Sequence, residues 1–170
     1  MSEKEKLNFE QIFSENKDKV YRLCKGFLGD TPEVDDLFQE IFIKVWNGLD
    51  KFRGEAQVST WIYRIASNTA LLYKKRSTKN KTAVRSQDDF SQLKIKMEDD
   101  SNEAKQAQEK QLNQLLFCIS KLEKTNRIII TMLLDDFSYK EIADVTGISV
   151  NYVGVRVNRI KTILKKELNQ

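Results

Sequence analysis

The sequence contains no histidine and only two cysteines, Cys24 and Cys118. Histidine is the side chain that most often acts as a general base, and two isolated cysteines cannot supply the usual zinc-ligand sets. Glycine-rich phosphate-binding loops and the Gly-x-Ser-x-Gly turn of hydrolases are absent as well. The sequence therefore predicts no metal site, no cofactor, no catalytic centre and no small-molecule substrate.

Proline and glycine are scarce, at one and six residues in 170, which favours helices because both residues interrupt them. No secretion signal opens the chain, and no apolar run is long enough to cross a bilayer. Both cysteines fall within apolar helical patterns, so we expect buried, unpaired thiols of the kind found in a reducing cytosol. These features predict an all-α, cytoplasmic protein.

Charge is distributed unevenly, although the net charge of +4 is modest. Acidic residues are missing from residues 61–81 and again from residues 151–166, and both stretches are rich in lysine and arginine. Acidic residues concentrate instead in residues 33–40 and 88–109. Because charge acts as a local field, two basic patches far apart in sequence suggest two contacts with one polyanion.

The clearest pattern lies in residues 137–166. Ser138 stands three residues before Glu141, the spacing of a capping box in which each side chain bonds a free backbone N–H at a helix start. Gly147 can adopt the left-handed conformation that ends such a helix, and Ser149 is suited to capping a second one. Apolar residues then recur at alternating steps of three and four, as on one side of an amphipathic helix: Val150, Val153, Val157, Ile160 and Leu164.

A short capped helix, a glycine turn and a longer basic helix outline a helix-turn-helix, whose second helix enters the major groove of DNA. Four side chains point away from the apolar stripe: Asn151, Tyr152, Arg156 and Arg159. Arginine suits this position because its fork of donors pairs with guanine edges and phosphates. The same pattern also fits an ordinary pair of antiparallel helices with solvated basic residues, but we favour DNA binding.

A second helix is predicted from Thr31-Pro32-Glu33, which combines a cap, a proline in the first turn and an acid at the positive end of the helix dipole. Opposite its apolar stripe, the helical period gathers three polar residues and one apolar residue on one face: Asp36, Gln39, Glu40 and Ile43. This face is either a solvated acidic surface with one stray isoleucine or a docking surface for a basic partner. The residues alone leave the two interpretations even.

Residues 50–58 interrupt the helical pattern at Gly54 and are predicted to form a loop that carries Phe52 and Arg53. Ser59 would cap the next helix, from Thr60 to about residue 76, whose apolar, core-facing side includes Ile62, Ala66 and Leu72. Its other side carries basic and polar side chains with Trp61 at the flank, and single-stranded nucleic acid needs such rings for base stacking beside cations for phosphate contact: Trp61, Arg64, Asn68, Lys74 and Lys75. Simple packing of the aromatic rings and a solvated helix end also explain the pattern, and from the residues alone we favour that interpretation.

The stretch from residue 77 to about residue 105 is polar and weakly patterned, and we interpret it as a linker with a transient turn near residues 90–97. Helical stripes resume around Leu116 and Ile129, in two helices expected to support the helix-turn-helix, and Thr125 or Asn126 is predicted to start the second of them. The predicted fold is therefore two small helical domains, residues 1–76 and 106–170, joined by a flexible linker at residues 77–105.

Both halves resemble one family. The first half contains the blocks DDLFQEIFIKVW and KFRGEAQVSTWIYRIASNTALLYKKR, which resemble region 2 of bacterial sigma factors. The second half contains KLEKTNRIIITMLLDDFSYKEIADVTGISVNYVGVRVNRIK, which is similar to their region 4. Two such blocks in this order, with only a linker between them, resemble the extracytoplasmic-function (ECF) class.

The resemblance implies roles that spacing alone does not provide. It implies that Asp36, Gln39, Glu40 and Ile43 dock on core RNA polymerase. It implies that the loop of residues 52–59 captures a flipped base of the −10 promoter element beside the following helix, with the contributing residues Phe52, Arg53, Trp61, Arg64, Asn68, Lys74 and Lys75. The helix-turn-helix would read the −35 element as duplex through Asn151, Tyr152, Arg156 and Arg159.

Two positions depart from the family pattern. Glu123 stands where members often have a proline, and Gly154 occupies a place in the recognition helix where a polar or basic residue is frequent. We transfer no base contact to Gly154. The expected partners are core RNA polymerase, promoter DNA and an anti-sigma protein, which in this class is often membrane-anchored. The alternative is a stand-alone transcriptional regulator, which would leave the Asp36–Ile43 face unexplained; an RNA-processing hydrolase ranks far below both.

Overall fold

The computed structural model describes the backbone of residues 3–79 and 103–170 and the side chains of residues 8–73 and 103–170. In these ranges the chain forms α-helices and one 3-10 turn, without strands, which confirms the predicted all-α fold. The elements in order are α1 (Glu3–Leu28), α2 (Glu33–Gly48), the turn η1 (Leu49–Lys51), α3 (Val58–Lys79), α4 (Glu103–Ser120), α5 (Lys124–Leu134), α6 (Tyr139–Thr146) and α7 (Val150–Leu168). The interior of the predicted linker, residues 80–102, lies outside the described residues.

Helices α1, α2 and α3 form the first unit. The apolar stripe predicted for α2 is largely confirmed, since Leu37 and Ile41 are fully buried against α1 and α3. A cluster of aromatic rings joins α1 to α2, with Phe9 and Trp46 edge to face at 4.7 Å between ring centroids. On α3, however, Leu72 was predicted to be buried and is 53% exposed. Packing on this side of α2 fixes its opposite, acidic face toward solvent.

Helices α4 to α7 form the second unit, in which α5 lies in the middle. Residues Arg127 to Met132 of α5 are all buried, which covers every side of the helix. The stripe of α7 packs on this unit as predicted for Val153, Val157, Ile160 and Leu164, but Val150, the first residue of the helix, is 46% exposed. A helix buried on all sides must have neighbours on all sides, and α6 and α7 provide only some of them.

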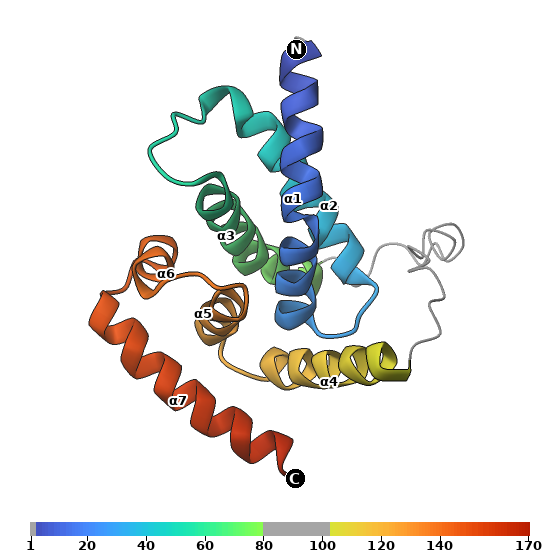
Figure 1. Ribbon diagram of the computed structural model, residues 1–170, viewed down its shortest axis with the longest axis vertical. Helices are drawn as coiled ribbons and strands as arrows, with labels where there is room; N and C mark the ends of the chain where they lie inside the picture. Colours follow the sequence, from blue (N-terminus) through green and yellow to red (C-terminus); the bar gives the residue numbers. More distant parts are fainter. Residues whose placement is uncertain (1–2, 80–102) are drawn as a thin grey trace.

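The remaining neighbour of α5 is α1, because the two units pack against each other (Figure 1). Helix α1 contacts both α4 and α5, and α3 contacts α6. The buried apolar residues of both units belong to one continuous cluster. The sequence pattern predicted two helical sets and did not indicate that they share an interface.

The helix ends around the helix-turn-helix follow the sequence closely. Both bonds of the predicted capping box are present, from the Glu141 N–H to Ser138 Oγ at 3.2 Å and from the Ser138 N–H to Glu141 Oε2 at 2.8 Å. Ser149 accepts a bond from the Tyr152 N–H at 3.1 Å. Gly147 is left-handed, with φ of 76°. These ends fix the angle at which α7 leaves α6.

Three other helix starts were predicted slightly wrongly. Thr31 makes no side-chain cap for α2; its backbone oxygen accepts from the Val34 N–H instead. Helix α3 begins before Ser59, and α5 begins before Thr125. At each start the carbonyl of the residue before the helix accepts the first i→i−4 hydrogen bond, from the Trp61 N–H to Gln57 O and from the Arg127 N–H to Glu123 O, so each helix begins before the residue predicted to cap it.

Candidate nucleic-acid interface and docking surface

The outer face of α2 presents the predicted docking residues. Asp36 and Gln39 are exposed, and Ile43 is 59% exposed although Ile41 and Phe42, which precede it in the helix, are buried. Glu40 is half-buried and forms an ion pair with Lys44 at 3.3 Å. The structure therefore brings the four residues together on one accessible surface, where an exposed isoleucine stands among acids.

The acidic field of this face reaches the neighbouring helix. Burial, and then the charges of Asp36, Glu33 and Glu40, raise the pKa of Tyr73 on α3 to about 12. A phenol responds in this way because nearby carboxylates disfavour a second negative charge. The carboxylates of α2 thus lie near enough to α3 to act on Tyr73, and an acidic face of this kind suits a basic partner.

The loop between η1 and α3 holds an aromatic pair. The rings of Phe52 and Trp61 lie 4.9 Å apart between centroids and are tilted by 41°. Both are half-buried, and Gly48 leaves room for the indole: a Cβ there would lie 3.1 Å from it. Arg53 is exposed beside them, in the turn before left-handed Gly54. This arrangement offers ring faces and a cation at one place, as a stacked base requires.

Along α3, Arg64 and Asn68 are exposed on the side predicted to follow nucleic acid. Lys74 and Lys75 lie in the same helix, but their side chains are outside the described residues. Arg64 Nη2 donates a long hydrogen bond, 3.4 Å, to the backbone oxygen of Asp144 in α6. The second unit therefore touches the predicted path of single-stranded DNA.

On α7 three of the four predicted DNA contacts are free to meet a groove. Asn151 and Arg159 are exposed, and the Tyr152 ring is 40% exposed. Val155 adds an exposed apolar side chain on the same helix. The sequence pattern passed over Val155, although an apolar residue outside the core stripe was a visible signal that it could contact a thymine methyl.

Arg156 is engaged differently from Arg159. Its Nη1 donates to Glu123 Oε2 at 2.9 Å and to Asn126 Oδ1 at 2.8 Å, and its guanidinium lies 5.2 Å from the centroid of the Tyr152 ring. The side chain is only 19% exposed. Glu123, the residue directly before α5, thus ties Arg156 to the start of that helix, which leaves fewer donors for DNA.

One row of polar residues was missed by the sequence analysis. Arg127 and Thr131 of α5 and Asp135, the residue directly after the helix, follow one another at steps of four, so they lie on one side, and all three are buried. Polar residues at helical spacing normally indicate a solvated face, but the apolar triplet Ile128-Ile129-Ile130 beside them was a signal that this helix has little solvated surface.

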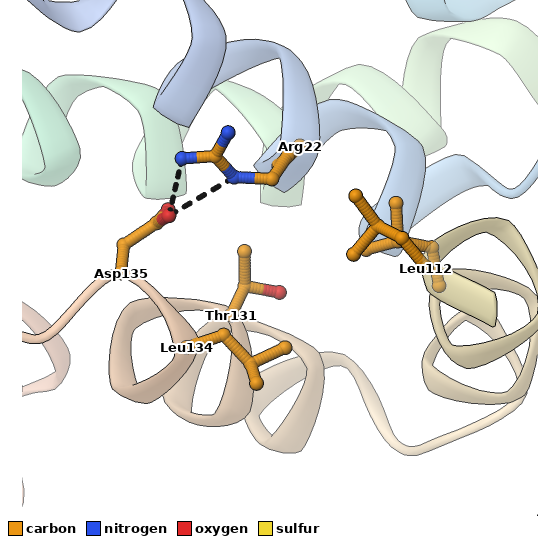
Figure 2. Close-up of a pocket in the computed structure, with 6 residues that line it drawn as sticks. Arg22, Leu112, Thr131, Leu134 and Asp135 are labelled. Atoms are coloured by element: carbon orange, nitrogen blue, oxygen red, sulfur yellow. Dashed lines mark hydrogen bonds and ion pairs between the residues drawn. The ribbon is translucent and has the colours of Figure 1, made fainter. Parts of the chain in front are cut away.

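Asp135 is the centre of this row. Its Oδ1 accepts two bonds from Arg22 of α1, at 2.6 Å from Nη2 and 3.0 Å from Nε (Figure 2). Its Oδ2 accepts a hydrogen bond from the Tyr63 hydroxyl of α3. Burial raises the pKa of Tyr63, and the charge and hydrogen bond of Asp135 raise it further, so the phenol stays protonated and donates.

Within the described residues no group of histidine, cysteine or acidic side chains is arranged to hold a metal ion. The same residues contain no helix that is long and apolar enough to span a membrane.

Comparison with known proteins identifies two segments. Residues 12–80 match the family described as Sigma-70 region 2, and residues 112–164 match the family described as Sigma-70, region 4. These segments coincide with the two packed units.

Several whole proteins are similar over most of the chain. The ECF RNA polymerase sigma factor SigW of Bacillus subtilis (strain 168) is 30% identical over 165 residues, which covers 94% of this chain and 88% of that protein. The ECF RNA polymerase sigma-E factor of Escherichia coli (strain K12) is 33% identical over 159 residues, covering 88% and 81% respectively.

Two solved structures share the fold. CnrH, in complex with the cytosolic domain of CnrY, superposes with a TM-score of 0.65 at 21% identity over 96% of this chain and 89% of its own. The sigma factor RpoE of Bartonella quintana, in complex with the anti-sigma factor NepR, gives 0.69 at 18% identity over 95% and 97%.

Proposed function

Because this chain belongs to the ECF family of RNA polymerase sigma factors, we propose a division of labour between its two units. The chain is a transcription initiation factor that directs core RNA polymerase to promoters. In our proposal residues 1–76 dock on polymerase and hold the opened −10 element, residues 77–105 link the units, and residues 106–170 read the −35 duplex.

The observation that carries this proposal is the pairing of two accessible surfaces in one chain. One is the exposed face of Asp36, Gln39, Glu40 and Ile43 on α2; the other is the outer side of a doubly capped helix-turn-helix. A stand-alone regulator needs only the second surface. The first is explained by a partner whose contact surface is basic and apolar.

The −10 contacts are proposed for the aromatic pair and the exposed side of α3. Extruding a base from the stack costs roughly a few kcal/mol, and stacking on Phe52 or Trp61, at roughly 1–3 kcal/mol per base, would offset that cost. Arg53, Arg64, Asn68, Lys74 and Lys75 would then follow the phosphates. The protein makes and breaks no covalent bond in this process, so we propose that it acts without catalysis of its own. We also propose that it acts in the cytoplasm, where transcription takes place.

The −35 contacts are proposed for Asn151, Tyr152 and Arg159, with Arg156 in a lesser role because it is tied to Glu123 and Asn126. An anti-sigma protein is proposed as a further partner. Its support is that the two structural neighbours, CnrH and RpoE, were solved in complexes with CnrY and NepR.

Run-off transcription with core polymerase on a randomised promoter pool tests the proposed function. We expect transcripts from a subset with two shared elements, and no initiation would contradict it. A gel shift separates the regulator alternative, because a regulator should bind duplex tightly without polymerase.

Docking is tested by Asp36→Lys combined with Gln39→Ala, which should lower affinity for core polymerase at least tenfold. The matched control is Glu10→Lys with Gln11→Ala, the same exchange on an exposed part of α1. Equal affinity of the two double variants would refute the α2 assignment.

A further inference from the structure

The side of α7 that points away from the core is centred on a valine. Figure 1 shows α7 at the rim of the molecule, with α5 and α6 on one side of it. Val153 and Val157 of the buried stripe face these helices. Val155 lies two residues from each of them, which at about 100° per residue places it opposite their mean direction. It is 44% exposed. We call the side of α7 around Val155 the outward side.

One edge of the outward side lies against α5. Arg156 is bonded to Glu123 and Asn126 at the start of α5, at 2.9 and 2.8 Å. Its guanidinium lies 5.2 Å from the centroid of the Tyr152 ring. Arg156 therefore reaches back toward α5, with the Tyr152 ring beside it, and these two residues mark the edge of the outward side and not its middle.

The other edge lies against α6. A Cβ built on Gly154 would lie 3.5 Å from Cε2 of Tyr139, the first residue of α6. The tyrosine ring thus covers α7 at the place where the glycine stands, and a longer side chain at residue 154 would meet the ring. Gly154 therefore gives up a base contact of its own and lets α6 pack closely on α7.

Between these two edges the outward side carries five exposed residues at steps of three and four: Asn151, Val155, Asn158, Arg159 and Thr162. The first four lie within residues 150–159, the first half of α7. The early residues of a recognition helix are the ones that meet base edges in the major groove. Residues 151–166 of the sequence contain no acid, so the field along this helix favours a polyanion.

The chemistry of Val155 selects thymine. Its side chain ends in two methyl groups and has no hydrogen-bond donor or acceptor. Among the base edges in the major groove, only thymine presents an apolar group, its C5-methyl. Folding gives no reason for a valine here, because the residue lies outside the core and valine is a weaker helix former than alanine or lysine. A contact with a thymine methyl accounts for it.

Asn158 is placed to read the next base pair. It is exposed and lies three residues after Val155, a rise of about 4.5 Å along a helix. Successive base pairs are separated by a similar distance, about 3.4 Å. The carboxamide of asparagine pairs with N6 and N7 of adenine through two hydrogen bonds. The two side chains together therefore suit two adjacent A·T pairs.

From this arrangement we propose that Val155 and Asn158 are the specificity-determining residues for the −35 element. Val155 packs on the methyl group of a thymine, and Asn158 pairs with the adenine of an adjacent base pair, on either strand. This inference rests on the proposed function, in which α7 enters the −35 duplex. Asn151 and Arg159 contact the DNA around this pair, whereas Arg156 holds α7 in place from the edge.

The thymine contact is tested with a base analogue. Run-off transcription by core polymerase and the wild-type protein, on promoters randomised in the −35 element, first identifies the preferred sequence, in which we expect a thymine beside a second A·T pair. Uracil in place of that thymine removes only the C5-methyl group. It should lower transcription with the wild type about fourfold, the effect of burying one methyl-sized group, and leave transcription with Val155→Ala unchanged.

The adenine contact is tested in the same way. Replacing the adjacent adenine by 7-deazaadenine removes the N7 acceptor and keeps the Watson–Crick pair. We expect transcription with the wild type to fall at least fivefold, as for the loss of a bidentate base contact. Transcription with Asn158→Ala should be insensitive to the analogue.

Matched controls come from the same helix and its end. Val150 is 46% exposed at the start of α7, and Asn169 is exposed directly after it. Val150→Ala and Asn169→Ala should respond to both analogues as the wild type does. An analogue that leaves the wild type unchanged, or that lowers the wild type and the corresponding variant equally, would overturn the assignment of that residue. Failure of the proposed function would look different, because the wild type would then initiate on no promoter.

Discussion

The two units of this sigma factor bury their helices in different ways. In the first, α1, α2 and α3 enclose Leu23, Leu37 and Ile62 among themselves. In the second, α5 has apolar residues against α6 and α7 but sets its polar row, Arg127, Thr131 and Asp135, against α1. The first unit therefore has a complete core of its own, whereas the second uses the first to cover a polar face.

The contact between the two units is therefore mixed. It contains the charged and hydroxyl groups of the polar row, and it also contains buried apolar residues such as Ile119 beside Gly26, because one apolar cluster continues from one unit to the other. Separating the units would expose side chains of both kinds.

The largest effects should come from truncation inside the two cores. Ile41→Ala in the first unit and Ile160→Ala in the second both remove fully buried side chains, and each should lower the free energy of unfolding by about 2–5 kcal/mol. Because one buried apolar cluster joins the two units, we expect both to unfold in one shared transition when urea denaturation is followed by circular dichroism. Two separate transitions in the wild type would show that the units unfold independently.

A smaller loss is expected for Arg127→Ala, which acts on both sides of the comparison. Its guanidinium donates to the Leu122 backbone oxygen at 2.6 Å within the second unit and to the Phe27 backbone oxygen of the first unit at 2.7 Å. Each buried carbonyl left without a partner costs about 1–3 kcal/mol. Thermal unfolding measures the sum, and Lys121→Ala, on an exposed residue just after α4, is the neutral control.

Base reading should separate two arginines on α7. Arg159→Ala removes an exposed guanidinium and should cost about 1–3 kcal/mol of discrimination at one position of the −35 element. Arg156→Ala should weaken transcription at all −35 sequences alike, because it frees α7 from Glu123 and Asn126. Promoter selection with each variant measures this, and a new base preference for Arg156→Ala would contradict the assignment.

The smallest effects should come from the helix caps of the second unit. Ser138→Ala and Ser149→Ala each remove one side-chain cap, worth about 1 kcal/mol of stability. Ser59→Ala in the first unit serves as the comparison, since α3 starts before that residue. We expect a change within about 0.5 kcal/mol there, and equal losses at all three serines would argue against the cap geometry.

Much of this fold could be predicted from sequence because the signals are local. The capping box of Ser138 and Glu141 needs only residues three apart, and the exposed face of Asp36 and Ile43 follows from the helical period and a strong stripe opposite. Leu72 was misplaced because periodicity gives a side of a helix but not how far the neighbouring helices reach along it.

The contact between the two units could not be predicted from local sequence signals. Arg127, Thr131 and Asp135 form a polar row, which by itself indicates water, and the α1 residues that cover it lie about a hundred positions earlier. The hydrogen bonds of Arg156 to Glu123 and Asn126 could not be predicted for the same reason, since these two residues lie at the start of α5 and not on α7. Whether the proposed contact residues bind DNA and polymerase remains a prediction that the variants above test.

The two natural cysteines have a use that follows from where they lie. Cys24 is in the first unit and Cys118 in the second, both buried and unpaired, and burial raises the pKa of the Cys24 thiol. A thiol reagent can modify each only after its own surroundings have opened. The two labelling rates, measured by mass spectrometry on the wild-type protein, would thus report how readily each unit opens locally.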